Sequence, residues 1–252
     1  MKVTLNFTPF RRMIRPLSLY SETTRSKGPD GKVTWKIGRN IRIFGYRRPD
    51  HQVRLTVITL NPERISGLCN NHPEFSIKAP TTRGMGTAAG GKEIIIETKP
   101  EQDHLTIRTD DFRYNVEKSS GAGDLHLEER YIPMDQIKLT GSILKNKLQK
   151  YIHFAPSGPL RLVISDDTVR FVSTIDDEKA SLDITDQVTV HSGSRNREYL
   201  YDIGLLSDAI KKLPTKKEIK FVVNNDLIKF QCDIGDNIGY INYYQRGRIN
   251  TS

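Results

Sequence analysis

The stretch Asn225-Asp-Leu-Ile-Lys-Phe-Gln-Cys-Asp-Ile234, followed by Gly239-Tyr-Ile-Asn-Tyr-Tyr-Gln-Arg-Gly-Arg-Ile249, carries most of the information about the fold. From position 228 to 234, apolar residues alternate with polar ones, which is typical of a strand with one buried face. The same alternation recurs along most of the chain and predicts antiparallel sheets with one face in solvent. The predicted strands lie at 33–37, 41–43, 53–57, 105–107, 112–116, 160–164, 169–171, 182–184, 188–190, 219–221 and 228–234.

Helical patterns are few in this sequence, and they carry basic residues. Between 141 and 152, apolar residues at 144, 148, 151 and 152 share one helical face. A second helix is predicted from Asp202, its N-cap, to Leu213, and Pro214 stops it. A third is predicted from Thr8 to position 15, where the following proline ends or kinks it.

The two halves of the chain repeat one order of elements. Each half begins with a short alternating strand and continues into a basic helix, and each later reaches a strand with the sequence Lys-Glu-Ile, at 92–94 and 217–219. A repeat of about a hundred residues or more predicts two similar domains, whereas the repeats of a solenoid are much shorter. We expect an N-terminal domain at 1–117, a flexible connector at 118–134 that begins with Gly- and Ser-rich sequence, and a C-terminal domain at 135–252.

The composition favours a binding protein with a polyanionic partner. The chain has 252 residues, with 39 Lys and Arg against 30 Asp and Glu, and a net charge of +9. Such a field attracts nucleic acid, an anionic membrane or acidic partners. Cys69 and Cys232 are too few for a disulfide framework, and the N-terminus lacks the apolar run of a signal peptide. We therefore expect an intracellular protein of the cytoplasm or nucleus that is not secreted, and no stretch has the roughly 20 apolar residues of a membrane span.

No residue pattern in the sequence predicts catalysis, a metal site or a cofactor. The six histidines are scattered without ligand spacing, so a zinc site is not expected. The Gly-rich stretch at 84–91 precedes a strand rather than a helix, which argues against a phosphate-binding loop. Acidic pairs such as Asp166-Asp167 leave a carboxylate–metal nuclease as the enzyme alternative, but Asp is common in turns.

Basic residues are concentrated in the predicted helices, where acidic residues are rare. Phosphate contacts of this kind give binding that is independent of sequence and weakens with salt. The candidate residues of this polyanion-binding surface, which the resemblance described next assigns to DNA, are Arg11, Arg12, Arg15, Lys145, Lys147, Lys150, Lys211 and Lys212, together with Arg83 in the Gly-rich stretch and Lys216 after the last helix.

Several short motifs resemble the sliding clamps of the proliferating cell nuclear antigen (PCNA) family. The segments 225–234 and 239–249 are similar to the clamp's final strands, and Leu125-His-Leu-Glu-Glu-Arg-Tyr-Ile-Pro133 is similar to the end of its interdomain connector. Residues 199–213 resemble its last helix. The resemblance implies an α+β fold of two tandem clamp domains, with antiparallel sheets and two short basic helices in each.

The resemblance also implies a function and an assembly. A clamp of this family is a DNA polymerase processivity factor: it encircles double-stranded DNA, with its basic helices facing the duplex, and tethers DNA polymerase and other clamp-binding proteins. Its ring, here expected to be a homotrimer, closes through paired edge strands. The matching segments are 111–117 and 180–186, which place Phe112, Tyr114 and Val116 against Leu182 and Ile184 of a neighbour.

The family's partner pocket implies a third set of residues, namely Val53, Leu127, Ile132, Tyr243 and Ile249. Here Gln245-Arg246-Gly247 replaces the family's Leu-Ala-Pro, so the pocket lacks its proline and has an arginine nearby. The net charge of +9 is a further departure, because such clamps are usually acidic outside the hole. Two alternatives therefore stay open: a monomeric basic DNA-binding accessory factor of a polymerase, and a protein-interaction scaffold on the clamp fold.

Overall fold

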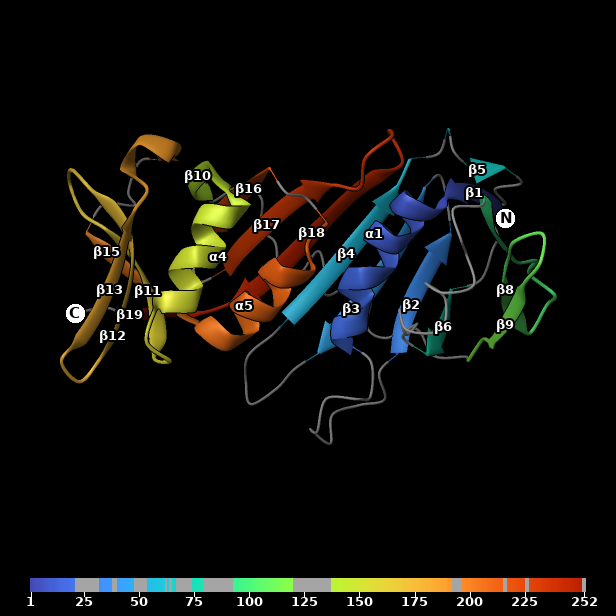
Figure 1. Cartoon of the computed structure of the whole chain (residues 1–252), viewed down its shortest axis with the longest axis horizontal. Helices are drawn as coiled ribbons and strands as arrows, with labels where there is room; N and C mark the ends of the chain where they lie inside the picture. The colour runs from blue at the N-terminus through green and yellow to red at the C-terminus, as the bar shows by residue number, and fades with distance from the viewer. Residues whose placement is uncertain are drawn as a thin grey trace. The chain divides into compact units, whose positions relative to one another are not determined.

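The chain divides into two compact units of antiparallel strands and short helices (Figure 1). The computed structural model describes residues 1–20, 32–37, 40–47, 54–61, 63, 65–66, 74–78, 93–119, 137–191, 196–214, 217–224 and 227–250. Unit 1 comprises Met1–Pro49, Leu55–Leu125 and Asp233–Asn242, and unit 2 comprises Asp50–Arg54, His126–Cys232 and Tyr243–Ser252. Most of the predicted connector, from position 120 on, and the Gly-rich stretch at 84–91 lie outside the described residues.

Unit 1 begins with a strand that leads directly into a helix. Strand β1 (Lys2–Asn6) belongs to a five-stranded sheet in the order β5-β1-β7-β8-β9, and the neighbouring strands β4-β3-β2-β6 belong to a second sheet. The bounds are β2 (Lys32–Ile37), β3 (Ile41–Arg47), β4 (Arg54–Leu60), β5 (Ile65–Ser66), β6 (Phe75–Lys78), β7 (Glu93–Glu97), β8 (His104–Arg108) and β9 (Arg113–Glu117). The residues of β18 (Gly239–Arg246) are divided between the two units.

Helix α1 (Phe7–Leu17) covers the core of unit 1 with one apolar stripe. Phe10, Met13, Ile14 and Leu17 recur at helical spacing and are all buried. The helix passes Pro16 and ends one residue later than that proline, before a short 3-10 turn at Ser18–Tyr20. A proline in the last turn removes only one hydrogen bond, so the helix tolerates it there.

Unit 2 repeats the same opening, a strand followed directly by a helix. Strands β14-β10-β16-β17 are neighbours in one sheet, and β13-β12-β11-β15-β19 form a second sheet. The elements are β10 (Ile137–Leu144), α4 (Lys145–Phe154), β11 (Pro159–Ile164), β12 (Val169–Ile175), β13 (Glu178–Asp183), a 3-10 turn η4 (Thr185–Gln187), β14 (Val188–Val190), β15 (Arg197–Asp202), α5 (Ile203–Lys212), β16 (Glu218–Asn224), β17 (Leu227–Asp233) and β19 (Arg248–Asn250). Its core contains a chain of rings in which Phe221 packs against Phe171 and Phe230 at centroid distances of 6.4 and 6.1 Å.

The predicted helix at 141–152 was wrong at its start, because Gly141–Leu144 is strand. This segment pairs on both sides, with Gly141 opposite Val188 of β14 and Phe221 of β16. A Cβ at Gly141 would lie 2.6 Å from the Gln187 carbonyl oxygen, so the close pairing requires glycine there. The helix therefore begins at Lys145, and tertiary pairing overrides the helical pattern before it.

The internal repeat is visible in the strand register. In unit 1, Asn6 pairs with Glu93 and Leu5 with Ile94. In unit 2, Leu144 pairs with Glu218 and Ile143 with Ile219. In both units, the Lys-Glu-Ile strand therefore lies antiparallel to the first strand, at the point where the basic helix begins. The other predicted strands are also present, with ends that differ by a few residues.

Candidate functional site

Cations on α1 lie on the face opposite its buried stripe. Arg11 and Arg15 are exposed, and the helix contains no acidic residue. Arg12 is half-buried, and its Nη1 donates to the Ile234 carbonyl oxygen at 3.0 Å. Arg11 and Arg15 therefore present their charge to solvent, while Arg12 also fastens the helix to the turn after β17 within unit 1.

Helices α4 and α5 of unit 2 pack side by side and carry the second group of cations (Figure 1). Lys150 and Lys211 are exposed, while Lys147 and Lys212 are half-buried. α4 has no acidic residue, and α5 has only the exposed Asp208. Asp202 caps α5 as predicted, because its carboxylate accepts the backbone N–H of Leu205 at 2.8 Å.

Lys145 does not belong with these surface cations. Its side chain is only 8% exposed, and the ammonium donates to the Leu213 carbonyl oxygen at the end of α5. A buried ammonium that donates to a backbone carbonyl joins the two helices instead of meeting a phosphate. Arg83 and Lys216, also predicted, lie outside the described residues.

The two predicted interface strands are the outer strands of their sheets. β9 ends the order β5-β1-β7-β8-β9 in unit 1, and β13 begins the order β13-β12-β11-β15-β19 in unit 2. Within the part of the chain that the structure describes, neither has a strand on its outer side. Both therefore offer backbone groups that a further strand can pair with.

Side chains along β9 and β13 only partly match the predicted apolar faces. Tyr114 is 44% exposed, and its ring stacks on Phe112 at 6.3 Å. Val116 is buried, and Leu182 is half-buried. Ile184 is fully buried, so it faces the core of unit 2 and not a neighbour, contrary to the prediction. β13 ends at Asp183, and the chain turns inward at Ile184, where φ is −130° and ψ is 13°.

Sequence reasoning missed two exposed apolar residues near β13. Phe154, the last residue of α4, is 78% exposed, and Ile175, the last residue of β12, is 36% exposed. The helix that ends at Phe154 contacts β13, and Ile175 pairs with Glu178 at the start of β13. The sequence holds a signal for Phe154, since this residue follows the last apolar position of the α4 stripe and falls outside it.

Hydrogen bonds organise the end of the β13 edge. The Asp183 carboxylate accepts the Thr185 hydroxyl at 2.7 Å and backbone N–H at 3.0 Å, and it also pairs with Arg170 at 3.1 Å. These bonds, with those from Thr185 the largest cause, lower the pKa of Asp183 to about 2. The turn after β13 is therefore held by an ionised carboxylate.

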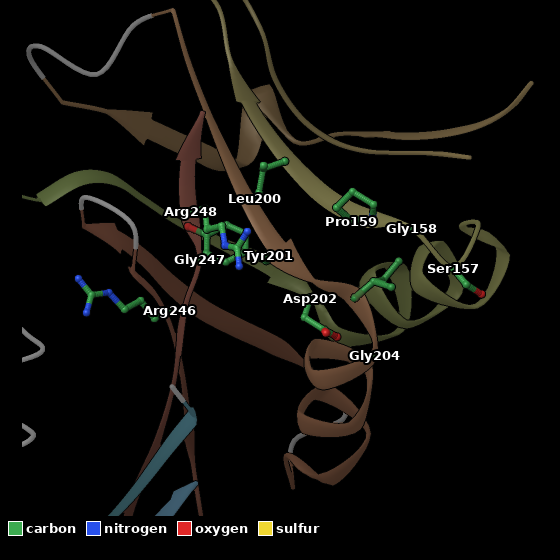
Figure 2. Close-up of a pocket in the computed structure, with 11 residues that line it drawn as sticks. Ser157, Gly158, Pro159, Leu200, Tyr201, Asp202, Gly204, Arg246, Gly247 and Arg248 are labelled. Carbon is green, nitrogen blue, oxygen red and sulfur yellow. The ribbon is translucent and has the colours of Figure 1, made fainter. Parts of the chain in front are cut away.

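A pocket of about 700 Å³ lies in unit 2 beside the start of α5 (Figure 2). The end of β15, the first residues of α5, the loop before β11 and the passage from β18 to β19 line it. The lining includes Gly158, Leu200, Asp202, Gly204, Arg246 and Arg248.

Tyr243, one of the predicted partner-pocket residues, is not among the described residues that line this pocket. Tyr243 is buried in unit 2, and its hydroxyl bonds with the Leu205 carbonyl oxygen and the Gln245 side chain. Ile249 lies on β19, next to the lining residue Arg248. Val53, Leu127 and Ile132 lie outside the described residues.

The described residues contain no metal centre and no membrane span. Over these ranges, no three His, Cys, Asp or Glu side chains gather into a group that can hold a metal ion, so the acidic pairs form no such cluster. None of the helices described is both long and apolar enough to span a membrane.

Comparison with known proteins identifies the fold. No protein-family model and no curated protein sequence matches the chain. Among solved structures, it is similar to PCNA from Thermococcus kodakaraensis, with a TM-score of 0.73 and 10% identity over 98% of this chain and 99% of that one. It is also similar to a chain of the PCNA2–PCNA3 complex from Sulfolobus tokodaii, with a TM-score of 0.70, 10% identity and the same coverage. The predicted α+β fold of two tandem clamp domains is therefore confirmed.

Proposed function

We propose that this protein is a DNA sliding clamp, a non-enzymatic processivity factor that encircles duplex DNA and tethers replication proteins. The observation that carries the proposal is the set of solvent-facing cations on α1, α4 and α5, on a chain with the fold of PCNA. Two of these helices contain no acidic residue to offset them. The clamp would act where the DNA is, in the cytoplasm or nucleus.

The open edges β9 and β13 support ring formation. A β9 edge on one copy can pair with a β13 edge on the next, which gives a head-to-tail interface that closes when its rotation fits. Tyr114 on one side, and Phe154 and Ile175 on the other, would then lose their exposure to water. We propose a homotrimer on this basis.

The helix cations support contact with the phosphate backbone. Apart from Arg12, which donates to the Ile234 carbonyl oxygen, the exposed or half-buried lysines and arginines of these helices are Arg11, Arg15, Lys147, Lys150, Lys211 and Lys212. Such contacts are independent of sequence, so a ring that uses them can slide. DNA polymerase and other clamp-binding proteins are the partners that this function requires.

A second candidate is a monomeric accessory factor that holds DNA by charge alone. The net charge of +9 favours it, because a field of this sign extends attraction for DNA beyond the helices. The two candidates differ in their dependence on DNA topology. A ring slides off short linear duplex, whereas a monomeric binder holds it with a steep salt dependence.

The test is primer extension by a DNA polymerase on primed circular templates, with the mass in solution measured by light scattering. A clamp lengthens products per binding event and has a mass near three times 28.8 kDa. A mass of 28.8 kDa at all concentrations, with tight and salt-sensitive binding of linear duplex, supports the monomeric factor instead. If reversal of the helix cations leaves activity intact, the protein is a scaffold.

A further inference from the structure

Arg12 carries a hydrogen bond that joins α1 to a distant part of the chain. Its Nη1 donates to the Ile234 carbonyl oxygen at 3.0 Å, and its side chain is half-buried, whereas Arg11 and Arg15 are exposed. Successive residues of a helix lie about 100° apart around its axis, so Arg12 projects from a different side of α1 than Arg11 does. Residues 1–49 and 233–242 belong to the same unit, so this bond is internal to unit 1.

The turn between β17 and β18, which accepts this bond, is itself held by several hydrogen bonds. Within the turn, the Asp233 carboxylate accepts the Gly235 N–H at 2.6 Å, and the Ile238 N–H donates to the Gly235 carbonyl oxygen at 3.1 Å. Figure 1 shows the turn beside the end of β4. There, the backbone N–H of Asn61 donates to the Ile238 carbonyl oxygen and its side chain donates to the Asn237 carbonyl oxygen, both at 2.8 Å. The turn is therefore a fixed support, and a bond to it can hold a helix in one orientation.

Gly235 leaves the space that the Arg12 guanidinium occupies. Its φ of +99° lies in the region of backbone conformations that favours glycine. A Cβ at this position would collide with the Arg12 Nη1, so an alanine there would push the guanidinium away from the Ile234 carbonyl oxygen. A substitution at Gly235 can therefore break the bond without any change of charge.

The corresponding helix of unit 2 is held by a different cation. The strand register aligns the first residue of α1 with the first residue of α4. Arg12 and Lys150 are then both the sixth residue of their helix, yet Lys150 is exposed. α4 is held instead by Lys145, which donates to the Leu213 carbonyl oxygen. In each unit, one cation of the first helix donates to a backbone carbonyl, while exposed cations of the same helix stay available to a ligand.

We propose that Arg12 is a positioning residue for DNA binding. Through the Ile234 carbonyl oxygen it sets the rotation of α1 about its axis, so that Arg11 and Arg15 face the duplex. Apolar burial holds α1 on the core of unit 1, but this force is non-directional and does not fix the rotation by itself. The hydrogen bond from the guanidinium is directional and charge-assisted. The inference rests on the proposed function, since it assigns phosphate contacts to Arg11 and Arg15 and gives Arg12 an indirect role.

The experiment is a double-mutant cycle with Arg12→Met and Gly235→Ala in the full chain. Anisotropy measures duplex affinity, and mass spectrometry measures amide hydrogen exchange in α1. Gly235→Ala keeps the net charge at +9, yet it should weaken duplex affinity about threefold or more because it displaces the guanidinium. In the Arg12→Met background, the same change should have no further effect on affinity. Each single variant should speed exchange of the α1 amides about tenfold and leave exchange in α4 at the wild-type rate.

Lys150→Met is the matched control, because it removes a cation at the equivalent, exposed position of α4. It should weaken duplex affinity through a lost phosphate contact and leave exchange in its own helix unchanged. The proposal is overturned if Arg12→Met behaves in the same way, with weaker binding and unchanged exchange in α1. It is also overturned if Gly235→Ala weakens binding equally in both backgrounds, or leaves it unchanged. A wild type that does not bind duplex sinks the proposed function, and exchange then decides the role of Arg12 in α1, which stands if Gly235→Ala speeds exchange only when Arg12 is present.

Discussion

Two carboxylates of unit 2 stabilise structure through the hydrogen bonds that they accept. Asp202 caps α5 through the Leu205 N–H, and Asp183 holds the turn after β13 through Thr185 and Arg170. Neither function requires burial, since a cap and a turn lie at the surface. Each can be tested by a single substitution that removes the acceptor.

Asp202→Ala should lower the free energy of unfolding by about 1 kcal/mol, because the first turn of α5 loses the acceptor for one of its N–H groups. Urea unfolding followed by circular dichroism measures the change. Asp208→Ala, at an exposed position within the same helix, is the control and should change stability much less. Equal losses in the two variants would show that the cap is unimportant.

Asp183→Asn should destabilise the protein in a pH-dependent way. The folded-state pKa of Asp183 is lowered from 3.8 to about 2, so its contribution is present above about pH 4 and is lost as the pH falls toward 2. The stability difference between wild type and variant, measured by urea unfolding from pH 6 to pH 2, should therefore shrink at the acid end. Asp177→Asn, in the turn before β13, is the control. A difference that stays constant with pH would contradict this role for the carboxylate.

At the scale of elements, the boundary between β10 and α4 is an example of an element boundary that local sequence patterns do not predict. The alternation and the Asp202 cap predicted β17, α5 and the repeated Lys-Glu-Ile strand, because those signals are local. The start of α4 was misplaced because β14 and β16 pair with Gly141–Leu144 from distant parts of the chain. No local pattern contains that pairing.

Individual side chains of the candidate site were harder to predict than the elements that carry them. Ile184 continues the alternation of β13 in the sequence, yet the strand ends before it and the side chain turns inward. Lys145 was expected on the surface because lysines usually are, whereas here its ammonium donates a hydrogen bond to the Leu213 carbonyl oxygen at the end of α5. The end of β13 determines where Ile184 points, and a buried hydrogen-bond partner determines where Lys145 points. Sequence periodicity encodes neither feature.

Lys145→Met should separate stability from DNA binding. It leaves the Leu213 carbonyl oxygen without the ammonium donor, and we expect a loss of about 1–3 kcal/mol in stability. Duplex affinity of the folded variant, measured by anisotropy, should stay close to wild type. Lys150→Glu, at an exposed position on the same helix, should weaken duplex binding and leave stability close to wild type. If Lys145→Met weakens DNA binding as much as Lys150→Glu does, Lys145 contacts DNA after all.

At the scale of the whole molecule, each unit contributes one of the two predicted interface edges, β9 in unit 1 and β13 in unit 2. Phe154, near the β13 edge, is the most exposed large apolar side chain of the described residues. Because it is already exposed in the single chain, a change there should affect assembly far more than folding.

If the protein forms the proposed homotrimer, Phe154→Asp should reduce the mass measured by light scattering from three times 28.8 kDa to 28.8 kDa, with the unfolding midpoint of the monomer preserved. A charge placed in a buried apolar interface opposes association. Leu144→Asp, at another exposed apolar residue that lies outside both edge strands, is the control and should keep the wild-type mass. A variant at Phe154 that still assembles would rule out this face as an interface.

The placement of charge, rather than its total, should control DNA binding. Arg15→Glu with Lys150→Glu changes the net charge from +9 to +5, because each reversal removes two charges. Log affinity for duplex DNA plotted against log salt should become shallower by about 0.9 for each phosphate that the variant no longer neutralises. The double change Lys99→Glu with Lys220→Glu reaches the same +5 at exposed positions outside the helices and should preserve the slope. Equal slopes in the two variants would favour a diffuse electrostatic attraction.

The membership of Asp233–Asn242 in unit 1 has a consequence for biosynthesis. Arg12 of α1 donates to Ile234, and the Asn61 N–H donates to Ile238, so the N-terminal unit contains contacts that span most of the polypeptide. A ribosome that has translated the whole N-terminal half has not yet supplied these partners. Residues 1–125 therefore remain without these contacts until residues 233–242 have been synthesised, and a truncation that removes 233–242 would damage the unit that contains α1.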